Sequence, residues 1–571
     1  MSTLPLLDSR TARLRLAMWT IVAGLAGCQS RAPDPKATKP RAPDAVVQAL
    51  ETISRTGRGI PGGGSSPEAR AQLARLYDAS AHTPLWVNSK GTLRPVGAEA
   101  LQRLVKADAD GLRPEDYAAG QLDSLARQVS AQEKPDPQTV ARLDAGMTVN
   151  VLGYLRHLHM GRVNPRSVGF ALDPPHERHD YVTLLSNALR EGSLDEVVAE
   201  LEPPLAQYRL TRDALTRYRS RPADSLAERP LRLPVPLKPG QAAPGLDALV
   251  RRLTYTGDLA TALAPVPLRY SGPLVAAVSR FQARHGLAPD SVVGQGTLDE
   301  LNVPLSWRAH QLELTLERLR WLRDLDNEPF VLVNIPMFEL TAWSSPMASG
   351  PPAFRSGVIV GKALDTQTPV FVEEMRYLIF RPYWNIPPSI ARDETVPAIE
   401  KDGSYLRKND MEIVRGQGDD ADPVELSDDA LERVSEGQLR IRQRPGANNS
   451  LGLVKFVFPN DENVYLHGTP AAELFDRNRR DFSHGCVRVE DPVGLAEWVL
   501  RDQPEWTRER IVEAMEDETK VSRRLTLTRP LTVVLFYTTA LVESDGRVRF
   551  AKDIYGHDER LDQALHLAAG P

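Results

Sequence analysis

The spacing of apolar residues changes along the chain, from a helical period in its first half to short β-branched runs in its second half. Between residues 66 and 220, apolar side chains recur every three or four positions, which is typical of helices with one face in a core. The clearest stretch contains Val140, Leu143, Met147, Val151, Tyr154, Leu155 and Leu158. After residue 329, short runs rich in Val, Ile and Phe are bounded by Pro and Gly and indicate strands of an antiparallel sheet. The sequence therefore predicts an α+β multidomain protein, with a helical domain at 65–220 and a β-rich domain at 330–560.

Three shorter segments separate these two domains. Residues 221–245 are rich in proline and are interpreted as a linker. Residues 246–304 predict a small helical unit, in which one helix ends at Gly286 and another starts at Thr297. A connecting helix is expected at 305–329.

The β-rich domain contains a polar insertion at residues 389–438. This segment is too long for an ordinary loop, and long loops in compact domains often cover a functional site, so we expect a lid. Its acidic residues Asp419, Asp420 and Asp422 are interpreted as a solvated surface.

The first 28 residues have the pattern of a secretory signal. Three arginines precede an apolar run at 16–25, which is too short to cross a ~30 Å hydrocarbon core as a helix. The run ends in Leu25-Ala26-Gly27-Cys28, which resembles the cleavage box of bacterial lipoproteins, where a lipid is attached to the cysteine. Gln29 in place of Asp favours the outer membrane, so we expect a periplasmic, lipid-anchored protein of a Gram-negative bacterium. The alternative is a plain secretory signal with an incidental cysteine.

Residues 29–64 are interpreted as an extended tether that holds the folded body away from the membrane. This polar stretch contains Pro33, Pro35, Pro40 and Pro43, and proline-rich linkers adopt extended conformations.

Cys486 is one of only two cysteines, and its surroundings suit nucleophilic catalysis. A disulfide between the two would join a signal segment to a distant domain and is not expected. An unpaired thiol in an oxidising compartment calls for a reason for its retention. His467, His484 and Arg488 could favour the thiolate, and Gly485 lets a reactant approach the backbone. Zinc held by the histidines and the cysteine is the competing interpretation, although no further ligand stands at a recognised spacing.

The residues around Cys486 resemble the signature of the L,D-transpeptidases, whose catalytic domain is called YkuD. The signature consists of His467-Gly468-Thr469 followed by Ser483-His484-Gly485-Cys486-Val487-Arg488. Further matching segments are 319–322, 333–336, 360–362, 368–371, 382–387 and 442–446. Together they resemble the large, scaffold-containing, YcbB-like type over most of residues 65–560. The resemblance implies a helical scaffold domain followed by a β-rich YkuD-type catalytic domain.

The resemblance also implies roles for individual residues. Cys486 corresponds to the nucleophile and His467 to the general base, which is often oriented by a backbone carbonyl in such enzymes. The residues expected to shape the pocket and the oxyanion site are Ser483, His484, Gly485 and Arg488. The candidates for the substrate groove are Tyr383, Trp384, Asn385, Gly468 and Thr469. Tyr383 and Trp384 could equally be core aromatics. No cofactor and no metal are expected.

The small helical unit at 246–304 resembles the three-helix peptidoglycan-binding module of many wall enzymes. The resemblance rests on residues 274–287 and 293–298, and Ser291 stands where the module usually has Gly. A purely structural role is the alternative.

The implied activity is acyl transfer on peptidoglycan, in which a thioester at Cys486 joins tetrapeptide stems through 3→3 cross-links. Carbapenems are expected to acylate the same sulfur. Water as the acceptor would give an L,D-carboxypeptidase, a free D-amino acid would give exchange, and a lipoprotein lysine would give protein anchoring. A non-catalytic wall-binding lipoprotein is an alternative of another class, which leaves residues 483–488 without a purpose. The net charge of −5 and the pI near 6.2 argue against a nucleic-acid partner.

Overall fold

The structure, a computed structural model, describes residues 44–567 apart from positions 65, 89 and 365. The chain divides into two units, Met1–Asp44 and Ala45–Pro571, and the following concerns the second unit. The predicted signal at 1–28, its Cys28 and the first part of the tether lie outside the described residues.

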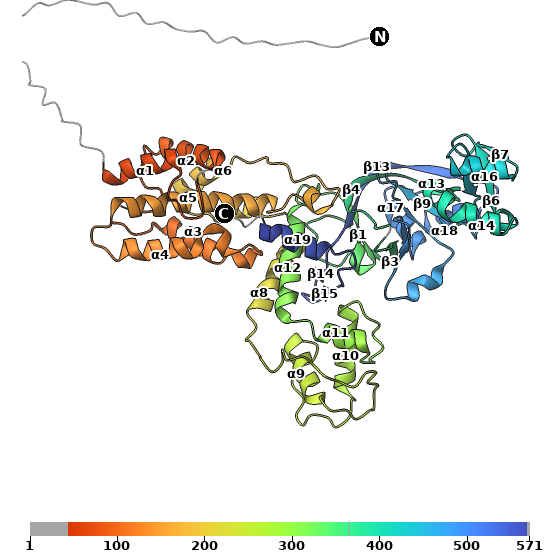
Figure 1. Cartoon of the computed structure of the whole chain (residues 1–571), viewed down its shortest axis with the longest axis horizontal. Coiled ribbons are helices and arrows are strands. Elements are labelled where there is room, and N and C mark those ends of the chain that lie inside the picture. The colour runs from red at the N-terminus through yellow and green to blue at the C-terminus, as the bar shows by residue number, and fades with distance from the viewer. Residues whose placement is uncertain (1–43, 65, 89, 365, 568–571) are drawn as a thin grey trace, which may run out of the picture. The chain divides into compact units, whose positions relative to one another are not determined.

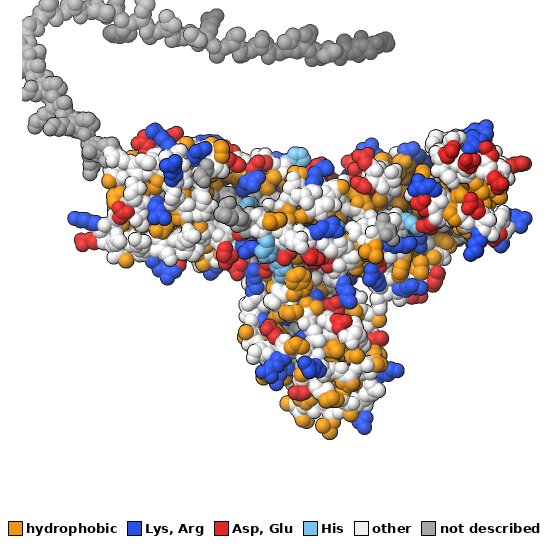
Figure 2. All heavy atoms as spheres, viewed as in Figure 1, with side chains coloured by type: hydrophobic (Ala, Val, Ile, Leu, Met, Phe, Trp, Pro, Cys, Tyr) orange, Lys and Arg blue, Asp and Glu red, His pale blue; other side chains and the backbone are white. Residues whose placement is uncertain are grey.

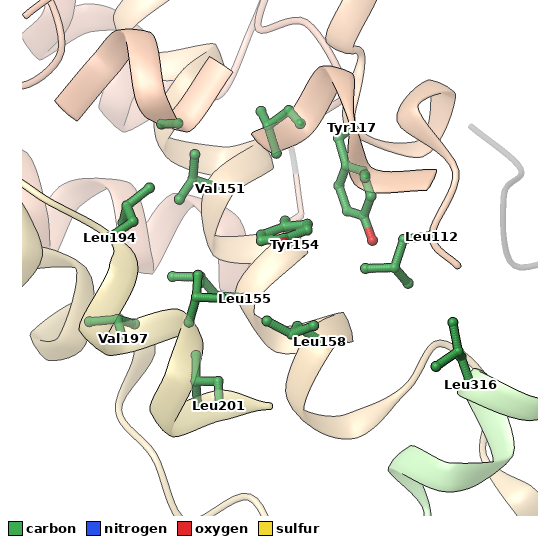
Figure 3. Close-up of a cluster of buried hydrophobic side chains, with 14 of the residues drawn as sticks. Leu112, Tyr117, Val151, Tyr154, Leu155, Leu158, Leu194, Val197, Leu201 and Leu316 are labelled. Atoms are coloured by element: carbon green, nitrogen blue, oxygen red, sulfur yellow. The ribbon is translucent and has the colours of Figure 1, made fainter. Parts of the chain in front are cut away.

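The helical domain is built around the long helix α5 (Pro137–Met160), which contacts α1 to α4, α6 and α7 (Figure 1). The proline at the start of α5 follows Asp136, whose side chain accepts a hydrogen bond from the Thr139 amide and caps the helix. The apolar stripe predicted for this helix is buried, and Figure 3 shows it beside leucine and valine side chains of α7. The other helices of the domain are α1 (Ala45–Thr56), α2 (Pro67–Ala79), α3 (Pro95–Val105), α4 (Ala119–Ser130), α6 (Tyr181–Glu191), α7 (Asp195–Leu201) and α8 (Ala206–Arg219).

Helix α1 corrects the prediction of an extended tether over residues 29–64. Its residues Ala49, Leu50 and Ile53 are buried against Ala141 and Ala145 of α5. The folded body therefore begins within the predicted tether, because this part of it carries an apolar helical face.

The small helical unit contains α9 (Leu246–Thr256), α10 (Pro273–Arg284) and α11 (Gln295–Leu301), which lie together in Figure 1. The last helix starts two residues before the predicted Thr297. Part of the predicted linker at 221–245 belongs to this unit, since Leu231, Leu233 and Leu237 are buried in its core. The high proline content of this segment favoured the prediction of a linker, although its leucines belong to a core.

Helix α12 (Leu305–Arg320) connects the small unit to the β-rich domain and is buried along most of its length. Arg318 and Arg320 have fully buried side chains that are paired with carboxylates. Arg318 Nη1 lies 2.5 Å from Asp558 Oδ1, and Arg320 Nη1 lies 3.2 Å from Glu317 Oε2. Loss of one partner from a buried pair typically costs about 3–5 kcal/mol. The Arg318–Asp558 pair therefore holds α12 against α19, whereas the Arg320–Glu317 pair lies within α12.

The main sheet of the β-rich domain closes on itself. Strand β2 pairs with both β1 and β3, which closes the order β3-β12-β10-β9-β4-β13-β1-β2, and β11 adds beside β3. The pairs β1–β13, β10–β12 and β11–β3 are parallel, which corrects the expectation of an antiparallel sheet. Apolar runs do not encode strand direction, which is set by the connections. The strands are β1 (Phe330–Asn334), β2 (Glu339–Trp343), β3 (Phe354–Gly361), β4 (Phe371–Phe380), β9 (Val454–Val457), β10 (Leu466–His467), β11 (Asp481–Ser483), β12 (Val487–Val489) and β13 (Arg523–Phe536).

The predicted insertion at 389–438 is a small subdomain with its own core. Ile386, Ile399, Ile413 and Ile441 are buried inside it. Its sheet has the order β5-β8-β6-β7, and its first and last strands in the chain, β5 and β8, widen it to residues 384–443. Acidic side chains gather over it in Figure 2, and the predicted acidic run is exposed. Its elements are β5 (Trp384–Asn385), α13 (Pro388–Ile390), α14 (Val396–Lys401), α15 (Tyr405–Lys408), β6 (Met411–Arg415), β7 (Asp422–Val424), α16 (Asp428–Ser435) and β8 (Arg440–Gln443).

The remaining elements are α17 (Pro492–Val499), α18 (Arg508–Glu516), β14 (Ala540–Val542), β15 (Val548–Phe550) and α19 (His557–Leu567). Strands β14 and β15 form a separate hairpin, and α19 extends past the predicted boundary at 560. Within residues 44–567, none of the helices described combines the length and the apolar character needed to span a bilayer.

Candidate active site

Two short neighbouring strands position the predicted nucleophile and base: His467 ends β10, and Cys486 immediately precedes β12. Strands β10 and β12 run parallel, with His467 opposite Arg488. The Val487 amide donates a hydrogen bond to the Tyr465 carbonyl at 3.1 Å, which places Cys486 beside Tyr465. Because alternate residues of a strand share a face, these four site residues lie on one face of the sheet. Cys486 and His467 are therefore diagonal neighbours on strands about 4.8 Å apart.

The Cys486 side chain is half-buried, and its Sγ lies 3.8 Å from the Asn463 carbonyl oxygen. Burial raises the pKa of the thiol above its ordinary value. Hydrogen bonds from Tyr465 and the positive charges of Lys455 and Arg488 act in the opposite direction and lower this pKa. The thiol is therefore protonated at rest, with groups in place that stabilise the thiolate once it forms.

The His467 side chain is buried, and a backbone carbonyl orients it. Nδ1 lies 2.5 Å from the Gly468 carbonyl oxygen. A carbonyl can only accept, so Nδ1 carries the proton and Nε2 is the basic nitrogen. Burial and the charges of Arg488 and Lys455 together lower the pKa of His467 to about 3, against the Gly468 carbonyl, which raises it. The ring is therefore neutral near pH 7 and able to take up a proton.

Two cations lie on the same face as the thiol. Lys455 of β9 is opposite His467, and its Nζ lies 3.6 Å from the centroid of the Tyr465 ring. Burial lowers the pKa of Lys455 and of Arg488, whereas the charge of Cys486 raises both. Among the residues described, neither cation forms a salt bridge, although the charge of Asp419 also raises the pKa of Lys455. This face therefore favours an anionic group such as a thiolate or an oxyanion.

Hydroxyl groups hold the turn before Cys486. Ser483 Oγ donates to the Cys486 carbonyl at 2.6 Å and accepts from the Gly485 amide at 3.2 Å. Thr368 Oγ1 donates to the Gly485 carbonyl at 2.8 Å. Gly485 has a φ of +112°, in the region that favours glycine. The Gly485 amide is thus engaged by Ser483, and the expected part of Gly485 in the oxyanion site stays a prediction. The Cys486 amide, for which no partner is found within the described chain, is the remaining candidate.

The structure separates His484 from the base. His484 is exposed, and its Nε2 lies 2.8 Å from Glu394 Oε1 in the insertion. At the base of the insertion, Trp384 forms a hydrogen bond with Tyr465. Burial raises the pKa of Tyr465, and the hydrogen bond from Trp384 lowers it by a smaller amount. The insertion therefore contacts His484, two residues before Cys486, and Tyr465 on the neighbouring strand, and its role as a lid stays a prediction.

The other predicted groove residues have structural partners. The Tyr383 ring lies 4.2 Å below the Arg442 guanidinium, and Asn385 Oδ1 accepts from Arg440 at 2.9 Å. Thr469 Oγ1 accepts from the Ala471 amide. Tyr383 and Asn385 thus join β5 to β8, and among the five groove candidates only Gly468 and Trp384 contact the residues around the thiol.

Sequence reasoning missed four residues of the site, namely Lys455, Asn463, Tyr465 and Glu394. Tyr465 could have been found, because it stands two positions before His467 and shares its strand face. The other three depend on strand register or on contacts of the insertion. No cluster of three or more His, Cys, Asp or Glu suited to a metal ion is found among the residues that the structure describes.

Two segments of the chain match known protein families. Residues 71–215 match the Scaffold domain, and residues 328–521 match the L,D-transpeptidase catalytic domain, YkuD, which includes Cys486 and His467. A protein of Haemophilus influenzae named "Putative L,D-transpeptidase" is 31% identical over 254 residues, which are 44% of this chain and 49% of that protein. The chain therefore matches about half the length of this relative.

Proposed function

We propose that this chain is a cysteine-dependent enzyme that forms 3→3 cross-links between peptidoglycan stems. This proposal is supported by the matches to a scaffold domain and, after it in the chain, an L,D-transpeptidase catalytic domain. The observation that carries this proposal is the arrangement of Cys486 and His467, diagonal neighbours on one face of two paired strands. The half-buried thiol and the neutral imidazole with a basic Nε2 suit acyl transfer.

In the first step, Cys486 Sγ attacks the carbonyl of the third stem residue, diaminopimelate. The thiol proton passes to His467 Nε2, since a neutral imidazole is the available base. The Cys486 amide is the candidate donor to the developing oxyanion, and the nearby charges of Lys455 and Arg488 offset its negative charge. The C–N bond then breaks, His467 returns the proton to the departing amine, and D-alanine leaves with a thioester on Cys486.

In the second step, the side-chain amine of another stem attacks the thioester. His467 takes a proton from this amine, the C–S bond breaks, and the proton returns to the sulfur. The products are a 3→3 cross-link and the free thiol. The contacts of His484 with Glu394 and of Trp384 with Tyr465 support a role for the insertion in covering the thioester against water.

The proposed location is the periplasm, with a lipid on Cys28 that anchors the chain to the outer membrane. The sequence from Leu25 to Cys28 supports this proposal. Metabolic labelling with an alkyne fatty acid would attach the label to the unaltered chain and leave a Cys28→Ser variant unlabelled.

Labelled tetrapeptide-containing wall fragments incubated with the protein test the proposal, with the products resolved by mass. We expect 3→3 dimers and released D-alanine from the unaltered chain, and neither from Cys486→Ala. A carbapenem should add its mass to Cys486 and not to the variant. Turnover by a folded Cys486→Ala variant would overturn the mechanism, and release of D-alanine without dimers would reassign the enzyme as a carboxypeptidase.

His467→Ala should lower the rate by several orders of magnitude, because it removes the base and the proton donor to the leaving amine. A loss below tenfold would reassign the base. The exposed His176 on the helical domain provides a control, and His176→Ala should retain full turnover.

A further inference from the structure

A second cleft, of about 500 Å³, lies between three parts of the chain and shares no residue with the candidate active site. One wall comes from the end of α8, and another from α9 and α10 of the small helical unit. The third wall consists of the β14–β15 hairpin and Arg355 of β3. A volume of this size is typical of sites that hold a small ligand or a short peptide.

The cleft is strongly basic. Its lining contains only two carboxylates, Asp258 and Glu543, in the part of the chain that is described. Its arginines are Arg217, Arg221, Arg280, Arg284, Arg355, Arg547 and Arg549. The last four are ion-paired with Asp258, Glu339, Glu543 or Asp545. No carboxylate of a described residue lies within 4 Å of the other three.

Backbone carbonyls hold these three guanidinium groups without neutralising them. Arg217 Nη2 donates to Gly546 at 2.7 Å, and Arg221 Nη1 donates to Tyr255 at 2.5 Å. Arg280 donates from Nε and Nη2 to the Asp258 backbone carbonyl, just after α9, at 3.0 and 2.8 Å. A guanidinium has five N–H donors, so each group retains free donors in a fixed position.

The two lining carboxylates are paired with other arginines, and the Arg221 guanidinium lies 4.8 Å from the centroid of the Tyr218 ring. This leaves a mutual repulsion among the three remaining positive charges. An anionic ligand would offset it. Planar guanidinium groups match carboxylates through paired hydrogen bonds, so a ligand with several carboxylates along a short peptide suits three such groups on separate segments.

We propose that this cleft binds the carboxylates of a peptidoglycan stem that is not being processed at Cys486. The inference rests on the proposed function for the identity of the ligand, because a diaminopimelate stem is a short peptide with several free carboxylates. A bound stem contacts both the small helical unit and the β-rich domain, and so holds the enzyme on the wall while another stem reacts.

The test measures sedimentation of the full chain with purified sacculi. Every protein carries Cys486→Ala, so that no turnover occurs. The cleft variant combines Arg217→Gln, Arg221→Gln and Arg280→Gln. The charge-matched control combines Arg70→Gln, Arg209→Gln and Arg251→Gln, three exposed arginines outside the cleft. We expect at least tenfold weaker binding of the cleft variant than of the control, with equal far-ultraviolet circular dichroism.

Sacculi whose carboxyl groups have been amidated identify the chemistry. The difference between the cleft variant and the control should disappear on amidated sacculi. Equal binding of the two variants to untreated sacculi would overturn the proposal, as would a difference that persists after amidation. Binding of both variants to inorganic pyrophosphate and to phosphatidylglycerol vesicles tests phosphate as the alternative ligand. If the cleft variant lost affinity for these probes but not for untreated sacculi, the proposal of a carboxylate ligand would be overturned.

Two measurements keep this proposal separate from the proposed function. If the cleft variant does not fold, the Cys486→Ala chain without further changes must still bind untreated sacculi at least tenfold more tightly than amidated sacculi at low salt. With Cys486 restored, the cleft variant should process a small soluble tetrapeptide at the rate of the control, because the cleft lies outside the active site. Loss of that turnover would place the arginines in catalysis, whereas absence of turnover in all proteins would refute the proposed function alone.

Discussion

His467 Nδ1 lies 2.5 Å from the carbonyl oxygen of Gly468, so the imidazole holds its proton on Nδ1 and has a basic Nε2. The pKa of His467 is lowered to about 3, and the pKa of the Cys486 thiol is raised. The resting pair is therefore a neutral thiol and a neutral imidazole. In the proposed mechanism the proton therefore moves during attack on the substrate, unlike in an enzyme with a preformed thiolate–imidazolium pair.

The pH profile of kcat/KM should lack an inflection near pH 6.5. His467 is already neutral above about pH 4, and the thiol remains protonated up to alkaline pH, so the resting state is constant between about pH 5 and 8. The measurement is the rate of D-alanine release from a soluble tetrapeptide across this range. An inflection between pH 6 and 7 would contradict this prediction.

Replacement of Lys455 should raise the pKa of the Cys486 thiol. The ammonium lies beside Tyr465 and lowers the thiol pKa through its charge, so Lys455→Met removes a group that favours the thiolate. The rate of iodoacetamide addition to the Cys486 peptide at pH 7.5, followed by mass spectrometry, should fall about three- to tenfold. The exposed Lys401 supplies the control, and Lys401→Met should react at the original rate. An unchanged rate for Lys455→Met would remove Lys455 from the electrostatics of the site.

Gly485→Ala should impair acylation with little loss of the overall fold. A φ of +112° is strained for alanine and costs about 1–3 kcal/mol, although no atom lies close enough to clash with the added Cβ. The turn is expected to shift, which displaces Cys486 from the Ser483 hydroxyl. Carbapenem acylation should slow at least tenfold, whereas Gly350→Ala, at an exposed glycine with ordinary φ, should not slow it. Acylation of Gly485→Ala at the original rate would show that the turn geometry is not required.

His310 should stabilise the fold at acidic pH. Its Nδ1 lies 3.0 Å from Glu313 Oε2, and its Nε2 lies 2.9 Å from Asp562 Oδ1 on α19. Burial lowers the pKa of His310, but the two carboxylates outweigh burial and raise it above the ordinary value. Because the folded pKa is raised, the stabilisation is fully present below about pH 6.5 and is lost as the pH rises through the folded value.

The corresponding measurement is urea unfolding of His310→Gln at pH 5.5 and pH 8.5. We expect a loss of about 1 kcal/mol at pH 5.5 and a smaller loss at pH 8.5. His176→Gln, at an exposed histidine, should change the unfolding free energy little at either pH. A larger loss at pH 8.5 than at pH 5.5 would contradict the assigned direction of the pKa shift.

Several parts of the fold and site follow from local patterns in the sequence. The apolar stripe of α5 is buried as predicted, and the short β-branched runs are strands of the main sheet. The motif at 483–488 predicts Cys486 and Arg488 as site residues, the preceding motif predicts His467, and the structure places these residues close together. Other features do not follow from local patterns. Helix α1 was hidden by the prolines that precede it, and the segment at 384–443 gains its core only when β5 pairs with β8.

By itself, the sequence determined which residues are able to carry the chemistry and which segments form helices and strands, because motifs and apolar periods are properties of neighbouring residues. Only the tertiary structure decided what surrounds the thiol. The register of β9, β10 and β12 brings Lys455 and Tyr465 to Cys486 and turns His484 toward Glu394, and pairing between distant segments leaves no local pattern. The neutral state of the thiol and the imidazole also belongs to the folded chain, because the burial that shifts their pKa values does not exist in the extended polypeptide.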